Sequence, residues 1–239
     1  MSYTFDARVR FSEVNHKGRL TLPAIEDYLQ DTATFHGEEV GHGVRENTAD
    51  GVGWIIASLQ AKIFDYPEIG DHIRVRTWAA KFSSLLGLRE FDIRDEEGRT
   101  LLLAKSEWLL MDLAEHKPVK IPDLQLDAYG LDPDLVIKEN LGKRKIVLPG
   151  EGGETGEPIT AGEYMIDTNG HVNNGQYVRL SLGLLPRDIK VTDFRLNFKK
   201  QAYPGDVLCP VVYRLEKGWM VALNDSQGGP YFLGEYIAE

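Results

Sequence analysis

Five side chains that accept or donate hydrogen bonds lie within eight residues of one another. They are Asp167, Asn169, His171, Asn173 and Asn174. The segment stands where a strand-like run meets a helical one, and such a junction exposes unpaired backbone N–H groups and the positive end of a helix dipole. These groups stabilise a developing oxyanion. The segment therefore predicts a site that polarises a bound carbonyl group.

A structural explanation competes with this one. Asp167 or Asn173 could cap the following helix while Gly170 forms the turn. Capping explains one such residue, but it does not explain an imidazole and a further pair of asparagines in the same turn. The excess favours a catalytic role.

Other catalytic schemes have less support in the sequence. No G-x-S-x-G pentapeptide occurs, which disfavours a hydrolase with a nucleophile elbow. Cys209 lies in a strand-like run, and we interpret it as a small buried apolar residue. The histidines other than His171 show no metal-site spacing, and for His36 we expect a satisfied position in the core. We expect neither a metal nor a cofactor.

The order of motifs occurs twice along the chain, which indicates a repeated unit. Gly18, in residues 15–20, aligns with Gly170, in residues 167–172, and a helical run follows each. Residues 66–71 align with residues 203–206 through a shared Tyr-Pro pair, and acidic turns with glycine follow at 95–98 and 224–229. Each copy therefore predicts a strand, a helix and several antiparallel strands, an α+β architecture.

Apolar spacing predicts the individual elements. The first helix is expected from Pro23 to a stop at Gly37, and the second from Asn173 to Leu185. In the strand near residue 75, alternate residues share a face. One face carries Ile73, Val75, Thr77 and Ala79, and the other carries Arg74, Arg76 and Trp78. Trp78 is the exception on the charged face.

A segment of different composition separates the two copies. Residues 129–158 contain Lys143, Arg144 and Lys145 and a run rich in glycine and glutamate. The glycines lack the spacing of a nucleotide-binding loop, so we interpret the segment as a flexible surface linker. The predicted organisation is an N-terminal unit at 1–128, a linker at 129–158 and a C-terminal unit at 159–239.

Composition excludes several classes of partner. The 239 residues carry 27 basic and 37 acidic side chains, so the net charge is −10 and the chain as a whole does not attract nucleic acid or an anionic membrane. No apolar run approaches the roughly 18 residues of a membrane span, and no leader-like N-terminus is present. A single cysteine fits a reducing compartment. We expect a cytoplasmic protein without membrane insertion.

Taken together, these residues resemble the acyl-acyl-carrier-protein thioesterases of plants and bacteria, which have two hot-dog units in one chain. The marks are Gly18-Arg19-Leu20, Trp54, Tyr66-Pro67, Thr77-Trp78, Lys120-Ile121-Pro122-Asp123, and the 167–174 segment with Tyr177. The resemblance implies that each antiparallel sheet wraps around a central helix, that the two sheets pack together, and that the first unit holds the acyl chain in a tunnel. It also implies catalytic roles for Asp167, Asn169 and His171.

The chain departs from the family at one position. An acidic residue in the next strand usually completes the site, but here Gln201 stands at that place. A neutral amide can orient a water molecule but cannot act as a carboxylate base, so the base is Asp167 or His171. Alternatively, Gln201 faces solvent at a strand end. The first copy has Asn15, Lys17 and Arg19 at the aligned positions, so only the second unit is expected to catalyse.

The implied reaction is hydrolysis of fatty acyl-acyl-carrier-protein thioesters, which releases a free fatty acid and ends chain elongation. Water or the Asp167 carboxylate attacks, Asn169 stabilises the oxyanion and His171 relays protons. The expected substrate-binding residues are Asn173, Asn174, Trp54, Lys199 and Lys200. The two lysines, Arg195 and the 143–145 cluster are candidate landing sites for the acidic carrier protein and its phosphopantetheine arm.

Three other functions fit the same residues. An acyl-coenzyme A thioesterase differs only in the carrier, a dehydratase would use Asp and His to eliminate water, and a non-catalytic carrier-binding or lipid-binding module is compatible with Gln201. The sequence leaves the chain-length preference open. It also allows either a monomer or a homodimer that uses an additional face.

Overall fold

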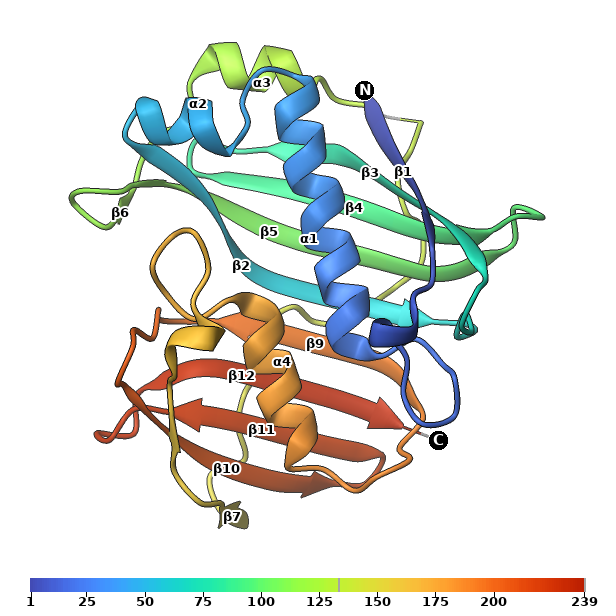
Figure 1. The fold of residues 1–239 in the computed structure, drawn as a ribbon. Coiled ribbons are helices and arrows are strands. Elements are labelled where there is room, and N and C mark those ends of the chain that lie inside the picture. Colours follow the sequence, from blue (N-terminus) through green and yellow to red (C-terminus); the bar gives the residue numbers. More distant parts are fainter. Residues whose placement is uncertain (133, 239) are drawn as a thin grey trace. The chain divides into compact units, whose positions relative to one another are not determined.

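The computed structural model describes residues 1–132 and 134–238. The chain divides into two compact units, residues 1–141 and residues 142–239 (Figure 1). Residues of the predicted linker are therefore shared between the two units. None of the helices in the described residues has the length and hydropathy needed to cross a membrane.

Unit 1 is an antiparallel sheet with one long helix, α1, lying across one face (Figure 1). The strands are β1 (Ser2–Arg8), β2 (Val52–Ile63), β3 (His72–Phe82), β4 (Leu86–Asp95), β5 (Thr100–Asp112) and β6 (Lys117–Pro118). Their order is β1-β3-β4-β5-β2, with β6 beside β5. The helices are α1 (Leu22–Glu39), α2 (Val44–Ala49), α3 (Asp123–Tyr129) and the 3₁₀ turn η1 (Phe11–Glu13).

Unit 2 repeats this plan on a smaller scale. Its strands are β7 (Gly153–Thr155), β8 (Ile159–Thr160), β9 (Val191–Phe198), β10 (Val207–Leu215), β11 (Gly218–Asn224) and β12 (Pro230–Ala238). Their antiparallel order is β9-β12-β11-β10-β7, with β8 also beside β10. The helix α4 (Asn174–Gly183) contacts β11 and β12, and the 3₁₀ turn η2 (Glu163–Met165) precedes it. The predicted strand, helix and antiparallel strands are confirmed in both copies.

The helix ends differ from the predicted ones. Thr21 caps α1 by accepting a hydrogen bond from the Ala24 N–H, but the helix runs past Gly37 to Glu39. Gly37 is a point of close approach instead, because a Cβ there would lie 2.9 Å from the His42 carbonyl oxygen. Glycine in this helix therefore satisfies packing, and the prediction that it ends the helix is wrong.

The two copies share one turn in detail. The Gly18 N–H donates to the Asn15 carbonyl at 2.9 Å, and the Gly170 N–H donates to the Asp167 carbonyl at 3.0 Å. Both glycines have positive φ, +76° and +81°, a conformation that other residues rarely adopt. The predicted alignment of Gly18 with Gly170 is confirmed.

A second predicted alignment, of residues 66–71 with residues 203–206, is wrong by two residues at its Tyr-Pro pair. The Leu20 N–H donates to the Pro67 carbonyl, and the Val172 N–H donates to the Ala202 carbonyl. Pro67 therefore corresponds to Ala202. The two Tyr-Pro pairs are not equivalent, because equivalent positions in the two copies are defined by these backbone hydrogen bonds and not by the side chains. The predicted alignment of Gly70 with Gly205 is correct, since their N–H groups donate to equivalent carbonyls, those of Val9 and Ala161.

The alternating pattern of β3 is confirmed, and the position of Trp78 has an explanation. The Arg76 guanidinium lies 5.3 Å from the centroid of the Trp78 ring, which is 2% exposed. Trp78 pairs with Glu90 of β4, and Glu90 accepts a hydrogen bond from the Ile137 N–H at 2.8 Å. Residues from the segment after α3 thus reach the sheet face opposite α1, which buries an aromatic ring there.

The segment at 142–148 makes similar bonds in unit 2. The Ile146 N–H donates to Asn197 Oδ1 at 3.1 Å, and Asn197 Nδ2 donates to the Arg144 carbonyl at 3.0 Å. Ile146 is 3% exposed and packs with Met220 and Leu233. Buried side-chain amides therefore fix the backbone of this glycine-poor part of the connection.

Candidate active site

The predicted catalytic segment forms a tight turn before α4. Ile166 and Val172 form an antiparallel bridge, and the Asp167 N–H donates to the His171 carbonyl at 3.0 Å. Within the turn, Asp167 Oδ1 accepts a hydrogen bond from the Asn169 N–H at 2.8 Å. The turn therefore places residues 167 and 171 opposite each other.

Asp167 and His171 are brought together by this turn. His171 Nδ1 lies 3.8 Å from Asp167 Oδ2, and the two side chains are only 11% and 16% exposed. Nδ1 is also 3.3 Å from the Val172 carbonyl oxygen. Both neighbours of Nδ1 are acceptors, so Nδ1 carries the proton in the neutral ring and Nε2 has the free lone pair. The geometry thus prepares Nε2 to accept a proton.

The helix-cap explanation applies to one residue. Asn173 is the N-cap of α4, and its Oδ1 accepts a hydrogen bond from the Gly175 N–H at 2.9 Å. Asp167 bonds inside the turn and does not cap the helix. Asn169 is exposed at the tip of the turn, and Asn174 is half-buried at the first helical position. The asparagines therefore have different structural positions.

The loop that contains Gln201 is bonded to the same turn. The Ala202 carbonyl accepts from the Val172 N–H at 2.8 Å, next to His171 in the chain. The Ala202 N–H donates to the hydroxyl oxygen of Tyr177 at 3.0 Å, and Gln201 Oε1 accepts from the Tyr203 hydroxyl at 3.1 Å. Gln201 is thus half-buried in a loop after β9, not within the strand.

The predicted basic residues differ in how far their charges are compensated. Lys200 pairs with Asp225 at 2.8 Å, and its Nζ lies 4.7 Å from the centroid of the Tyr231 ring. Arg195 pairs with Glu235 and also donates to the Lys143 carbonyl. Lys199 is exposed beside Lys200. The lysine pair is consequently the better candidate for contact with an acidic partner.

Trp54 lies in unit 1 in a buried polar and aromatic cluster. Its indole N–H donates to Gln125 Oε1 at 3.1 Å, and Gln125 Nε2 donates to Asn47 Oδ1 at 3.0 Å. The Tyr129 ring packs edge-on against Trp54 and against His36. Trp54 is therefore held by residues of α2 and α3, which closes one end of this unit's core.

His36 belongs to the same cluster and is only partly satisfied. Its Nδ1 lies 2.9 Å from Nη1 of Arg89, while its Nε2 has no hydrogen-bond partner in the described structure. Burial and the neighbouring guanidinium lower the pKa of His36 to about 3, so the ring is neutral. The expectation of a buried core histidine is correct, but one ring nitrogen is unsatisfied.

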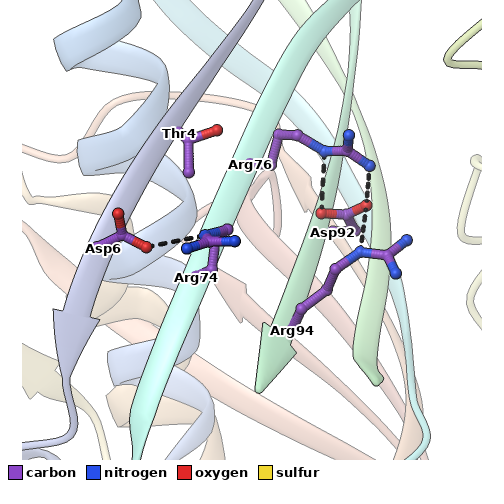
Figure 2. A pocket seen from close by; sticks show the side chains of 6 residues that line it. All are labelled: Thr4, Asp6, Arg74, Arg76, Asp92 and Arg94. Atoms are coloured by element: carbon purple, nitrogen blue, oxygen red, sulfur yellow. Dashed lines mark hydrogen bonds and ion pairs between the residues drawn. The ribbon is translucent and has the colours of Figure 1, made fainter. Parts of the chain in front are cut away.

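An open hollow lies on the face of the unit 1 sheet opposite α1. It is lined by Thr4, Asp6, Arg74, Arg76, Asp92 and Arg94. Figure 2 shows Asp92 between Arg76 and Arg94, and the Arg74 guanidinium directed at Asp6. Three guanidinium groups face two carboxylates, so the hollow is polar and almost neutral. Its lining does not suit an acyl chain.

Sequence reasoning gave no role to two buried side chains. Tyr177 is 2% exposed and bonds the Gln201 loop, and Glu26 is 1% exposed, with no hydrogen-bond partner for either carboxyl oxygen among the described residues. Comparison of the repeats gives a signal for both, because Ile25 and Val178 stand at the corresponding positions of the other copy. In the described residues, no three His, Cys, Asp or Glu side chains are arranged to hold a metal ion.

Solved structures support the fold. The chain superposes over its full length on an acyl-ACP thioesterase from Bacteroides thetaiotaomicron with a TM-score of 0.88, 23% identity and 98% coverage of that chain. The 12:0-ACP thioesterase from Umbellularia californica gives a TM-score of 0.86 and 19% identity, with 100% and 97% of the two chains covered. The predicted α+β fold of two tandem hot-dog units is confirmed.

Curated relatives are similar in sequence over part of their length. The palmitoyl-acyl carrier protein thioesterase of Arabidopsis thaliana chloroplasts is 24% identical over 250 residues, which cover 88% of this chain and 60% of that protein. An acyl-[acyl-carrier-protein] hydrolase from Cuphea viscosissima is 26% identical over 77% of this chain and 47% of its own length. The chain therefore spans roughly half of the curated relatives it matches.

A family model identifies the first unit. The model described as the acyl-ACP thioesterase N-terminal domain matches residues 1–129, more than half of the 239 residues. The chain belongs to the acyl-ACP thioesterase family.

Proposed function

We propose that the chain hydrolyses the thioester of a fatty acyl chain carried on acyl carrier protein. The observation that carries the proposal is the Asp167–His171 pair, 3.8 Å apart in a glycine turn before α4, in a chain of this family. Unit 2 performs the chemistry, and unit 1 holds the acyl chain. The aligned turn of unit 1 has Asn15 and Arg19 in place of the acid and the imidazole.

Water is the nucleophile in this scheme. His171 Nε2 removes a proton from water as the oxygen bonds to the thioester carbonyl carbon, and Asp167 stabilises the imidazolium through Nδ1. The Asn169 side chain, which is exposed at the tip of the turn, stabilises the oxyanion. When the C–S bond breaks, the imidazolium returns its proton to the departing thiolate. Gln201 orients the attacking water, which suits a neutral amide.

The geometry favours water over direct attack by Asp167. Oδ1 of Asp167 already accepts the Asn169 N–H, and Oδ2 is directed at the imidazole. Both carboxyl oxygens therefore serve orientation. A single turnover in ¹⁸O-labelled water tests direct attack, because an Asp167–acyl anhydride that water opens at the aspartyl carbon would release a fatty acid without label. An unlabelled fatty acid would show that the carboxylate attacks.

The test of the proposed function is thiol release from acyl carrier protein loaded with acyl chains of increasing length. Asp167→Asn and His171→Ala are each expected to lower kcat by about 10²-fold to 10⁴-fold, the usual contribution of a general base. Arg19→Ala in unit 1 is the matched control and should retain kcat. Folded variants of Asp167 and His171 with undiminished turnover would show that the assignment is wrong.

Parallel assays with the two carriers test which carrier holds the acyl chain, and they also test the non-catalytic alternative. Acyl-coenzyme A hydrolysed faster than acyl carrier protein would replace the proposed substrate with its closest rival. Tight binding of the loaded carrier without thiol release would instead identify a non-catalytic binding module.

A further inference from the structure

One backbone N–H group in unit 2, the proposed catalytic unit, depends on the phenol of Tyr177 for its hydrogen bond. The Ala202 N–H donates to the hydroxyl oxygen of Tyr177 at 3.0 Å, and Ala202 is completely buried. A buried N–H that loses its acceptor is costly, because water cannot replace the bond. Tyr177 therefore supplies an acceptor that this loop requires.

The other copy of the repeat removes the same requirement in a different way. Pro67 occupies the position of Ala202, since its carbonyl accepts from Leu20 as that of Ala202 accepts from Val172. Proline has no N–H, and Ile25, which cannot accept a hydrogen bond, stands where unit 2 has Tyr177. The chain thus avoids an unpaired N–H at this position in two ways. Unit 1 has proline with isoleucine, and unit 2 has alanine with tyrosine.

Only the tyrosine solution links the parts of the candidate active site. The peptide that donates to Tyr177 joins Gln201 to Ala202, and the Ala202 carbonyl holds the Val172 N–H beside His171. We infer that Tyr177 is a positioning residue, which fixes the Gln201 peptide and the His171 turn relative to each other through the backbone of Ala202. This inference rests on the proposed function.

The surroundings of the phenol suit this role. The Tyr177 ring stacks on Phe232 with 5.7 Å between centroids and 6° between planes, and Phe198 packs against both rings. Burial raises the pKa of Tyr177 well above its ordinary value, so the hydroxyl keeps its proton. A neutral oxygen on a ring held in one orientation is a fixed acceptor.

The first experiment replaces the hydroxyl and keeps the ring. Tyr177→Phe is expected to lower kcat for acyl carrier protein substrates by about tenfold to 100-fold, the effect of a small misplacement of catalytic groups, with KM changed less than threefold. Amide exchange of Ala202 should become faster. Wild-type kcat in this variant, or unchanged exchange at Ala202, would overturn the inference.

The second experiment transfers the solution of unit 1 into unit 2. Tyr177→Ile should be impaired like Tyr177→Phe, and Tyr177→Ile/Ala202→Pro should regain at least fivefold in kcat and melt at a higher temperature than Tyr177→Ile. A double variant that is more stable but equally inactive would assign the phenol to direct action on substrate. A double variant that is no more stable would contradict the pairing itself.

One control variant separates this role from general stability, and the wild-type assay separates it from the proposed function. Pro67→Ala creates the same unpaired N–H in unit 1, and it should lower the melting temperature while kcat stays unchanged. Absence of thiol release by the wild-type protein would reject the proposed function. In that case the exchange rate at Ala202 and the stability of the double variant still decide whether Tyr177 holds this loop.

Discussion

At the scale of single residues, the molecule holds ionisable groups in environments that differ strongly. His171 has acceptors on both sides of Nδ1, whereas His36 is kept neutral by burial beside Arg89. The two histidines have the same chemistry in isolation, and only their partners distinguish the proposed proton carrier, His171, from the core residue His36. Glu26 is the most extreme case, because both of its oxygens lack a hydrogen-bond partner in the described structure.

Glu26 is expected to make the protein less stable as pH rises above the ordinary carboxyl pKa. Burial raises its pKa well above the ordinary 4.5, with smaller contributions from Asp27 and Asp31. Between the unfolded and folded pKa values the unfolded state binds fewer protons. The free energy of unfolding therefore falls as pH rises, by up to about 1.4 kcal/mol per pH unit.

The measurement is urea unfolding of the wild type and Glu26→Gln between pH 5 and pH 8. The glutamine variant removes this ionisation, so the difference in stability between variant and wild type should grow with pH in favour of the variant. A constant difference across this range would show that Glu26 has an ordinary pKa. Glu39→Gln, an exposed change in the same helix, is the matched control.

At the scale of elements, the two copies show what a shared turn can and cannot determine. Both glycine turns have left-handed backbone at the same position, and both precede a capped helix. The caps differ, Thr21 in one copy and Asn173 in the other. The proposed catalytic groups stand on the turn and not on the helix, so substitution of their side chains is expected to change the chemistry and to leave the fold intact.

The segment at 142–148 of unit 2 should be sensitive to the loss of one side-chain amide. Asn197 is 2% exposed and bonds the backbone at both Ile146 and Arg144. Asn197→Ala leaves these groups unpaired and should lower the free energy of unfolding by about 2–3 kcal/mol. Chemical denaturation measures the loss, and amide exchange at Ile146 should rise. The exposed Gln227→Ala is the control, and equal effects of the two changes would contradict the role of Asn197.

At the scale of the whole molecule, charge restricts where an acidic partner can bind. The net charge is −10, so an acidic carrier protein is repelled at long range and needs a locally basic surface. In the hollow lined by Arg74, Arg76 and Arg94, Asp6 and Asp92 compensate most of the positive charge. Lys199 and Lys200 also keep one excess positive charge, and they directly precede Gln201 in the chain, which favours them as the proposed landing site.

Charge reversal tests this landing site. Lys199→Glu/Lys200→Glu should raise KM for acyl carrier protein about tenfold and leave KM for a short thioester analogue unchanged, because only the large partner meets the surface charge. Arg45→Glu/Lys217→Glu makes the same change in net charge at other exposed positions and serves as the control. Equal increases for both substrates, or for both variants, would count against docking at the lysines.

The repeat, the glycine turns, the strand alternation and the residues of the candidate site could all be predicted from the order of residues in the chain. These features depend on local backbone geometry and on periodicity, which a single chain segment carries. Gly170 and the 167–171 spacing already required the turn that sets Asp167 opposite His171.

The folded structure was needed to establish the relations between distant segments. It matched Pro67 with Ala202, continued α1 past Gly37, buried Trp78 and Glu26, and bonded Tyr177 to the loop of Gln201. Each of these depends on which backbone groups meet after folding, and residues more than about one turn apart do not encode that meeting locally. The acid and the imidazole are thus set by sequence neighbours, whereas the support that holds them is set by packing.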